Sequence, residues 1–376
     1  MVSNLKINFW NIQGYVNIDV KTKEIILNKI LQKYSINGFA KKLKISGVSI
    51  SYFLRNEGSF IRINNLLDMI KCLKISKHEM EKNIIGYKDT SSKKPFSIKF
   101  PYHLSPLHMR IGGVLIGDGN VNKTTGMMRW IQKDPIPLKK LMKIILGDAV
   151  VSKIHDSQIV IPAFFGKILC YSLNLNPPLL ASEKLIEKSL NLGKDYSIAL
   201  LIAIIEDEGN IDAKNYGGIN IRMSSKEIIH AIKKLCDYLG YKTSKITFYE
   251  NNGNFIGKNG KKLMYKIKIL SEGIKEMGND LIKLEKKYGK QIGFWKKEDQ
   301  FIKRWKTCTN KKAEKNREGG EIHNKINNLF EKHKTLSPLK VSKILGVDYD
   351  RVYVLIKNMS KRGEIKRINR GVYTIS

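Results

Sequence analysis

The chain has 376 residues, and its 68 Lys and Arg against 34 Asp and Glu give a formal net charge of +34. This length holds a substantial core and about two to four domains, and the charge favours a polyanion as partner. The 4 cysteines have no metal-ligand spacing, which indicates a reduced, cytosolic protein rather than a disulfide scaffold. The longest apolar run, Ile198 to Ile205, is too short to span a membrane, so we expect no membrane contact.

The first predicted unit is a small all-α domain with a linker, residues 1–95. We expect short helices at 36–43, 48–55 and 61–73, and a short strand pair within 8–20. From about 28 to 76 this pattern resembles the helix-turn-helix of phage repressors, which implies that the second helix enters the DNA major groove. The candidate DNA-contacting residues are Ser49, Ser51, Tyr52 and Arg55. The alternative is a helical bundle with no DNA role.

The central region, 96–290, contains two apolar stretches that predict similar helices. One starts at Ser105-Pro106 and should end at Asp118, and the other starts at an Asp195 N-cap and should end at Glu208. Small residues four apart occur in both helices and permit close backbone approach; they are Gly113 and Gly117 in the first helix and Ala199 and Ala203 in the second. Such packing brings Asp118 and Glu208 together, and the two like charges favour a divalent metal between them.

The nonapeptides Ile111 to Gly119 and Leu201 to Gly209 resemble the motif of the LAGLIDADG homing endonuclease family. Ile116 replaces the first acid of the motif in copy one, and Asp207 stands at a normally small position in copy two. The resemblance implies an α+β fold with a duplicated αββαββα core, repeats at about 105–194 and 195–285, that forms a pseudo-two-fold saddle. It also implies double-strand cleavage with Mg²⁺ or Mn²⁺ as cofactor.

The resemblance carries over to individual residues. Asp118 and Glu208 are the expected catalytic acids and metal ligands, with backbone carbonyls at Gly117 and Asp207 as additional metal oxygens. Further candidates for catalysis are Lys266, Lys268 and Lys153, which would steady the water or phosphate, and Gln132, which would position the water. For the side chains of Glu206 and Asp207 we favour a solvated-face interpretation.

Each repeat is expected to continue with a strand, a helix and a second strand pair. The strands are predicted at 127–132 and 219–224, the helices at 138–146 and 226–239, and the second strand pairs at 149–161 and 243–269. In the second repeat, alternation directs Asn220, Arg222 and Ser224 toward DNA. The corresponding face of the first repeat is Met128, Trp130 and Gln132, and Arg129 then falls in the apolar phase.

The C-terminal part is predicted to begin with a basic linker, 291–320, that is helical at first and then flexible up to Gly319-Gly320. Helices at 321–333, 338–345 and 348–362 and a hairpin at 364–375 indicate a winged-helix domain. Its positive charges suit phosphate contacts; they are Arg351, Lys357, Lys361, Arg362, Lys366, Arg367 and Arg370. The alternative is a winged helix used only for protein contacts.

The leading hypothesis is a free-standing, monomeric, site-specific endonuclease acting on double-stranded DNA, with DNA-binding domains on both flanks. The main alternative is a non-cleaving DNA-binding transcription regulator built on a degenerate form of the same core. An RNA splicing maturase, with RNA as partner, is a third hypothesis. An intein is disfavoured because the chain starts at Met1 and ends in Ile375-Ser376 without a terminal His-Asn.

Overall fold

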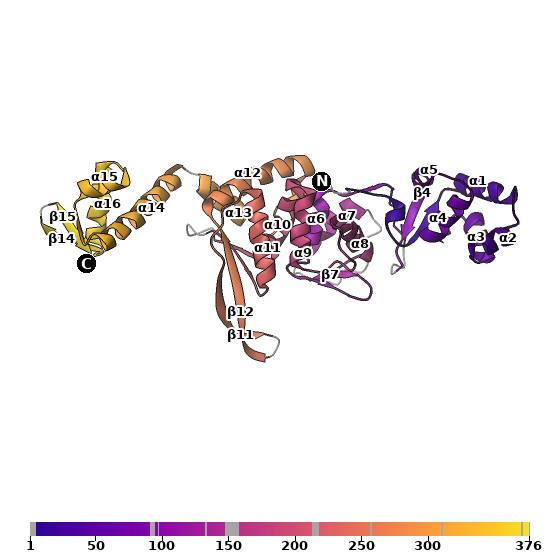
Figure 1. The fold of residues 1–376 in the computed structure, drawn as a ribbon, viewed down its shortest axis with the longest axis horizontal. Helices are drawn as coiled ribbons and strands as arrows, with labels where there is room; N and C mark the ends of the chain where they lie inside the picture. Colours follow the sequence, from indigo (N-terminus) through magenta and orange to yellow (C-terminus); the bar gives the residue numbers. More distant parts are fainter. Residues whose placement is uncertain are drawn as a thin grey trace. The chain divides into compact units, whose positions relative to one another are not determined.

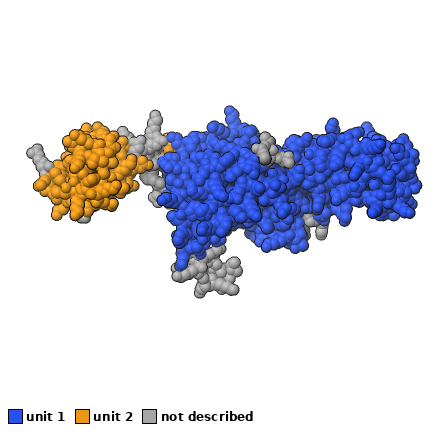
Figure 2. All heavy atoms as spheres, viewed as in Figure 1, with its two compact units in different colours: residues 1–304 blue, residues 305–376 orange. Residues whose placement is uncertain are grey.

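The computed structural model describes residues 5–90, 95–96, 98–131, 134–146, 158–212, 218–255, 258–309, 311–369 and 371–375. It divides into two compact units, residues 1–304 and 305–376 (Figure 2). The predicted α+β class is confirmed, because helices alternate with small antiparallel sheets along the described chain (Figure 1). The duplicated saddle stays a prediction. None of the described helices is long and apolar enough to cross a membrane.

The N-terminal part of the first unit combines short helices with a three-stranded sheet. Its elements are β1 (Lys6–Ile7), η1 (Phe9–Asn11), β2 (Tyr15–Ile18), α1 (Val20–Leu31), α2 (Ile36–Leu43), α3 (Gly47–Arg55), β3 (Ile61–Arg62), α4 (Ile63–Cys72), α5 (Lys77–Lys82) and β4 (Ile84–Lys88). The predicted helices at 36–43 and 48–55 are confirmed to within one residue. The expectation of an all-α domain is wrong, because β2 pairs with β3 and β4.

The predicted strand pair within 8–20 is also wrong. The strands of this region find partners far along the chain: β2 lies between β3 and β4, and β1 pairs with β5 (Tyr102–His103). Alternation within one short segment does not show which distant strand completes a sheet.

Helices α2 and α3 are joined by a tight turn at Lys44, which adopts a left-handed conformation with φ of 55°. Helix α3 buries Ile50, Phe53 and Leu54 and leaves its opposite face exposed. The buried Lys23 of α1 donates from Nζ to the carbonyl oxygens of Asn56 (2.6 Å) and Glu57 (2.9 Å), just after α3. These hydrogen bonds attach the end of α3 to α1.

The central part of the first unit contains two sheets, ordered β6-β7-β8 and β11-β12-β10-β9. Its elements are α6 (Pro106–Gly113), β6 (Gly119–Val121), β7 (Met128–Ile131), α7 (Ile136–Leu146), β8 (Gln158–Ile161), α8 (Ala163–Leu173), α9 (Glu183–Ser189), η3 (Leu190–Leu192), α10 (Lys194–Glu208), β9 (Gly209–Ile211), β10 (Ile219–Met223), α11 (Lys226–Leu239), β11 (Thr247–Phe255), β12 (Lys258–Ile269), α12 (Ser271–Tyr288), η4 (Lys290–Ile292) and α13 (Glu298–Thr309). The β11–β12 hairpin projects beyond the helices (Figure 1). Much of the strand pair predicted at 149–161 lies outside the described residues.

The two predicted motif helices differ from expectation at their ends. Helix α6 stops at Gly113 rather than Asp118, and tight turns follow, with Leu115 N–H donating to Gly112 O. Two consecutive glycines at this point weaken a helix, which accounts for the early stop. Helix α10 starts at Lys194 with Gly193 as N-cap, so Asp195 is not the cap. Its carboxylate instead accepts from Lys287 Nζ at 2.9 Å.

The C-terminal unit consists of three helices and a three-stranded sheet in the described residues. Its elements are α14 (Lys311–Lys332), β13 (Thr335–Leu336), α15 (Pro338–Leu345), α16 (Tyr349–Lys361), β14 (Ile365–Asn369) and β15 (Val372–Ile375). The predicted helices and hairpin are confirmed. The flexible linker is wrong, because α14 continues through Gly319-Gly320. The predicted helix, whose apolar face starts at Ile322, is the C-terminal part of the longer α14. This apolar face packs on Val352 and Ile356 of α16.

Candidate functional site

Helices α6 and α10 pack with their backbones close together, as the small residues predict. A Cβ added at Gly113 would overlap the Ala203 methyl group and lie 3.0 Å from Leu200 O. A Cβ added at Gly117, in the turn after α6, would lie 2.5 Å from the Asp207 Cβ. Only glycine permits this approach, so these two positions hold the ends of the two predicted motifs against each other.

Three carboxylates gather where the two motifs end, and we call Asp118, Asp207 and Glu208 the acid seam. Burial, followed by the charges of Asp118 and Asp207, raises the pKa of Glu208 to about 7. Burial, followed by the Asp118 charge, raises the pKa of Asp207 to about 6. Asp118 itself is exposed. Mutual repulsion shows that the three carboxylates lie within electrostatic reach of one another.

A buried ion pair joins the two helices beneath the acid seam. Arg110 Nη2 of α6 lies 3.3 Å from Glu206 Oε2 of α10, and both side chains are buried. The guanidinium also donates to Gly293 O and lies 3.9 Å from the Trp295 ring centroid. Burial lowers the pKa of Arg110 to about 10, even though Glu206 opposes that shift.

Glu206 is therefore buried and Asp207 is only partly exposed, so the solvated-face interpretation of these two side chains is wrong. Glu206 accepts hydrogen bonds from the backbone N–H groups of Trp295 (2.9 Å) and Lys296 (2.8 Å) as well as from Arg110. Asp207 is partly buried and accepts from Trp130 Nε1 at 3.2 Å. Glu206 thus binds the segment after η4, and Asp207 binds Trp130 of β7; the sequence did not reveal either contact.

Two lysines bring positive charge to the acid seam, and sequence reasoning missed both. Lys297 Nζ donates to Ile205 O (2.9 Å) and Gly209 O (2.5 Å) at the C-terminal end of α10. The charge of Lys297 opposes the rise in the pKa of Glu208, and the charge of Lys296 opposes the rise in the pKa of Asp207. These lysines follow α12, outside both motif copies, where only a Lys-Lys pair after Trp295 marks them.

Two of the three lysines predicted for catalysis lie in the described residues. Lys266 and Lys268 are on β12, opposite Arg222 and Asn220 of β10 in the strand register. Their catalytic role stays a prediction, as does the metal role of the Gly117 and Asp207 carbonyls. Lys153 and Gln132 lie outside the described residues.

Strand β10 has the alternation of buried and exposed residues predicted for a DNA-contacting face. Ile219, Ile221 and Met223 are buried, whereas Arg222 and Ser224 are exposed and Asn220 is partly exposed. The strand register places Lys266 beside Arg222 and Lys268 beside Asn220 on the same face. Arg222 also lies 5.9 Å from the Tyr249 ring centroid. This face, which we call the β10–β12 face, is basic with one exposed aromatic ring.

The corresponding prediction for the first repeat is wrong in phase. Met128 and Trp130 are fully buried, whereas Arg129 and Ile131 are exposed. Burying Arg129 without a partner would cost far more than burying Trp130, so the charged residue decides the register. Trp130 therefore supports Asp207 from the core instead of contacting DNA.

The candidate DNA-contacting residues of the flanking parts are accessible. Ser49, Tyr52 and Arg55 are exposed on α3, and Ser51 is partly exposed. Of the cations predicted to contact phosphate in the C-terminal unit, Lys357, Lys361, Arg362, Lys366 and Arg367 are exposed and Arg351 is partly exposed. Arg362 is paired with Glu364 at 2.8 Å, which reduces its availability to phosphate. Arg370 lies outside the described residues.

Comparisons with known proteins give little help. No family model matches the chain, and no curated protein does. Among solved structures, full-length DUF199/WhiA from Thermatoga maritima is similar over 68% of this chain and 90% of that chain, with 13% identity and a TM-score of 0.31. The predicted membership in the LAGLIDADG family is therefore wrong: no family model supports it, and the structural match carries another family name.

The buried ion pair should dominate the stability of the central region. Arg110→Met leaves Glu206 buried without its cation, so we expect a loss of about 3–5 kcal/mol in the free energy of unfolding. Urea unfolding followed by the fluorescence of Trp130 and Trp295 would measure it. Arg222→Met, at an exposed arginine, is the control and should stay within about 0.5 kcal/mol. A loss in Arg110→Met no greater than in this control would contradict the assignment.

The acid seam should make stability pH-dependent in a defined direction. Because the folded-state pKa of Glu208 is raised, its contribution to stability is present at about pH 4 and is lost as pH rises through about 7. Glu208→Gln should therefore raise Tm at about pH 8 and leave it nearly unchanged at about pH 4.5, measured in EDTA. Glu24→Gln, on α1, is the control. An equal shift at both pH values would show that Glu208 does not titrate as described.

Proposed function

We propose that the chain is a site-specific double-stranded DNA-binding protein of the regulator type. The observation that carries this proposal is the α2–α3 pair, whose second helix presents a free outer face within a strongly basic stretch. Residues 29–56 contain no Asp or Glu; their cations are Lys29, Lys33, Lys41, Lys42, Lys44 and Arg55.

The dimensions of α3 suit a major groove. An α-helix with its side chains is about 10–12 Å across, and the major groove of B-DNA is about 12 Å wide, so a helix fits into it. The start of α3 is held by close packing of the first residue, since a Cβ added at Gly47 would lie 2.5 Å from Asn37 Oδ1. The end of α3 is held by Lys23. Ser49, Tyr52 and Arg55 thus project from a helix that is fixed at both ends.

Two further surfaces support a polyanionic partner. The β10–β12 face carries Arg222, Lys266 and Lys268, and the hairpin that extends it projects from the unit (Figure 1). The C-terminal unit adds exposed cations on α16 and β14. Positive charge spread over several elements gives sequence-independent attraction, and α3 adds the contacts that choose a site.

Selection from a randomised duplex library with the full chain should enrich one sequence. Arg55→Ala should then weaken binding to that duplex at least about 10-fold, because a base or phosphate contact of an arginine is lost. The measurement is a mobility-shift titration at fixed salt, with Lys82→Ala on α5 as the charge-matched control. Absence of enrichment, or equal binding of an RNA duplex of the same sequence, would refute a site-specific DNA regulator.

A second candidate function is metal-dependent cleavage of the bound DNA. One observation favours it: the acid seam brings Asp118 from one motif within electrostatic reach of Glu208 from the other. Their carboxylates suit Mg²⁺ or Mn²⁺, and the nearby Asp207 Oδ1 is buried without a hydrogen-bond partner among the described residues. A metal held by Asp118 and Glu208 would supply a nucleophilic water and neutralise phosphate charge. The nearby Lys297 already offsets part of the negative charge.

Cleavage is tested on the selected duplex with Mg²⁺ or Mn²⁺ against EDTA. If the seam is catalytic, strand scission should require the metal and should fall at least about 100-fold in Asp118→Asn and Glu208→Gln. Both variants should keep the affinity of the wild type, because the substitutions conserve shape. Tight binding with no scission at any metal tried would leave the regulator as the function.

A further inference from the structure

Helix α3 carries an unusual amount of exposed apolar surface. Val48 and Tyr52 are 79% and 63% exposed, and with Phe248 they are the three most exposed large apolar side chains among the described residues. Val48 and Tyr52 are four residues apart, so they lie one turn from each other on the same face of the helix. Grouped exposed apolar side chains indicate a binding surface.

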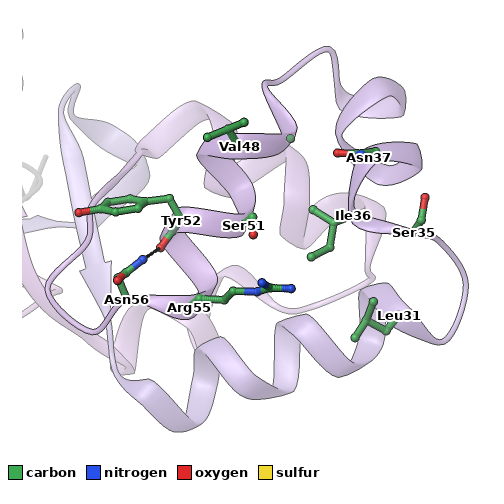
Figure 3. A pocket seen from close by; sticks show the side chains of 10 residues that line it. Leu31, Ser35, Ile36, Asn37, Val48, Ser51, Tyr52, Arg55 and Asn56 are labelled. Atoms are coloured by element: carbon green, nitrogen blue, oxygen red, sulfur yellow. Dashed lines mark hydrogen bonds between the residues drawn. The ribbon is translucent and has the colours of Figure 1, made fainter.

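These two side chains border a hollow of about 700 Å³. Leu31 from the end of α1 and Ile36 from the start of α2 add apolar surface to its lining, and the Arg55 side chain extends toward them (Figure 3). Arg55 lies about one helical turn after Tyr52 on α3. The surface therefore combines apolar contact groups with a cation that a polyanion requires.

The charges around this surface decide between occupants. None of the residues that line the hollow is acidic, and the whole stretch 29–56 carries only positive charges. A second copy of this chain would bring like charges together, which disfavours self-association. A DNA duplex has the opposite charge. Its major groove also presents an apolar group, the 5-methyl of thymine, which is the natural contact for an exposed apolar side chain.

We propose that Val48, together with Tyr52, recognises thymine 5-methyl groups in the major groove and so selects A·T pairs under the first turns of α3. This inference rests on the proposed DNA-binding function and adds the chemical basis of its specificity. The geometry suits the role, because Gly47 is covered by Asn37 and carries no side chain. Val48 is therefore the first side chain of α3 able to reach a base edge.

Uracil substitution tests the contact, because it removes only the 5-methyl group. In the duplex selected by the full-length wild type, each thymine is replaced in turn by deoxyuridine, and affinity is measured at fixed salt. At one or two positions the loss should be about fourfold for the wild type, the size expected for one buried methyl group. In Val48→Ala the same replacement should change affinity less than about 1.5-fold.

Ile25→Ala on α1, where Ile25 is 54% exposed, is the matched control and should respond to uracil as the wild type does. Because Val48 is so exposed, Val48→Ala should keep the wild-type circular dichroism spectrum and Tm.

Three outcomes overturn the inference while leaving the proposed function intact. The first is wild-type binding that no uracil replacement changes. The second is a uracil effect that persists at full size in Val48→Ala. The third is self-association of the wild type, seen by analytical ultracentrifugation, that Val48→Ala abolishes. Failure of the library to yield an enriched duplex would overturn both proposals, so the two are separable.

Discussion

The buried ion pair between Arg110 and Glu206 is the constraint on which the central region depends. A guanidinium and a carboxylate that leave water lose several kcal/mol of solvation each, and their mutual attraction and further hydrogen bonds offset this cost. Here the partners come from three places in the chain: α6, α10 and the segment around Gly293 and Trp295 after η4. The pair therefore requires all three to be in place at once, which specifies how the two motif helices pack.

The same packing produces the crowding of charge at the acid seam. Because glycine lets the turn after α6 approach α10, carboxylates from both predicted motifs come close, and burial together with the neighbouring charges raises the pKa values of Asp207 and Glu208. Lys296 and Lys297 are delivered to this place by the segment that Glu206 binds through its backbone. The contact between Glu206 and this segment thus holds the two lysines close to the acids of the seam. The packing of the fold therefore sets the balance of charge there.

Basic and apolar surfaces coincide elsewhere in the described chain. Val48 and Tyr52 lie in a stretch with no acid, and Tyr249 and Phe248 lie on the hairpin next to the β10–β12 face. Positive charge attracts a polyanion without regard to sequence, whereas apolar and aromatic groups discriminate among base edges. The two kinds of surface together favour a ligand with a charged backbone and with apolar groups on the base edges in its grooves. A nucleic acid duplex has both.

The sequence by itself determined the local elements. Helical spacing located α2, α3, α11 and α15 to within a residue or so, since their caps and apolar faces are short-range signals. Glycine spacing likewise anticipated the contact between α6 and α10. What only the tertiary structure decided were the long-range partners: the strands that pair with β1 and β2, the burial of Trp130 in place of Arg129, and the arrival of Lys297 at α10. Those choices depend on desolvation and on hydrogen bonds between residues far apart in the chain, and no local pattern encodes which distant group will supply them.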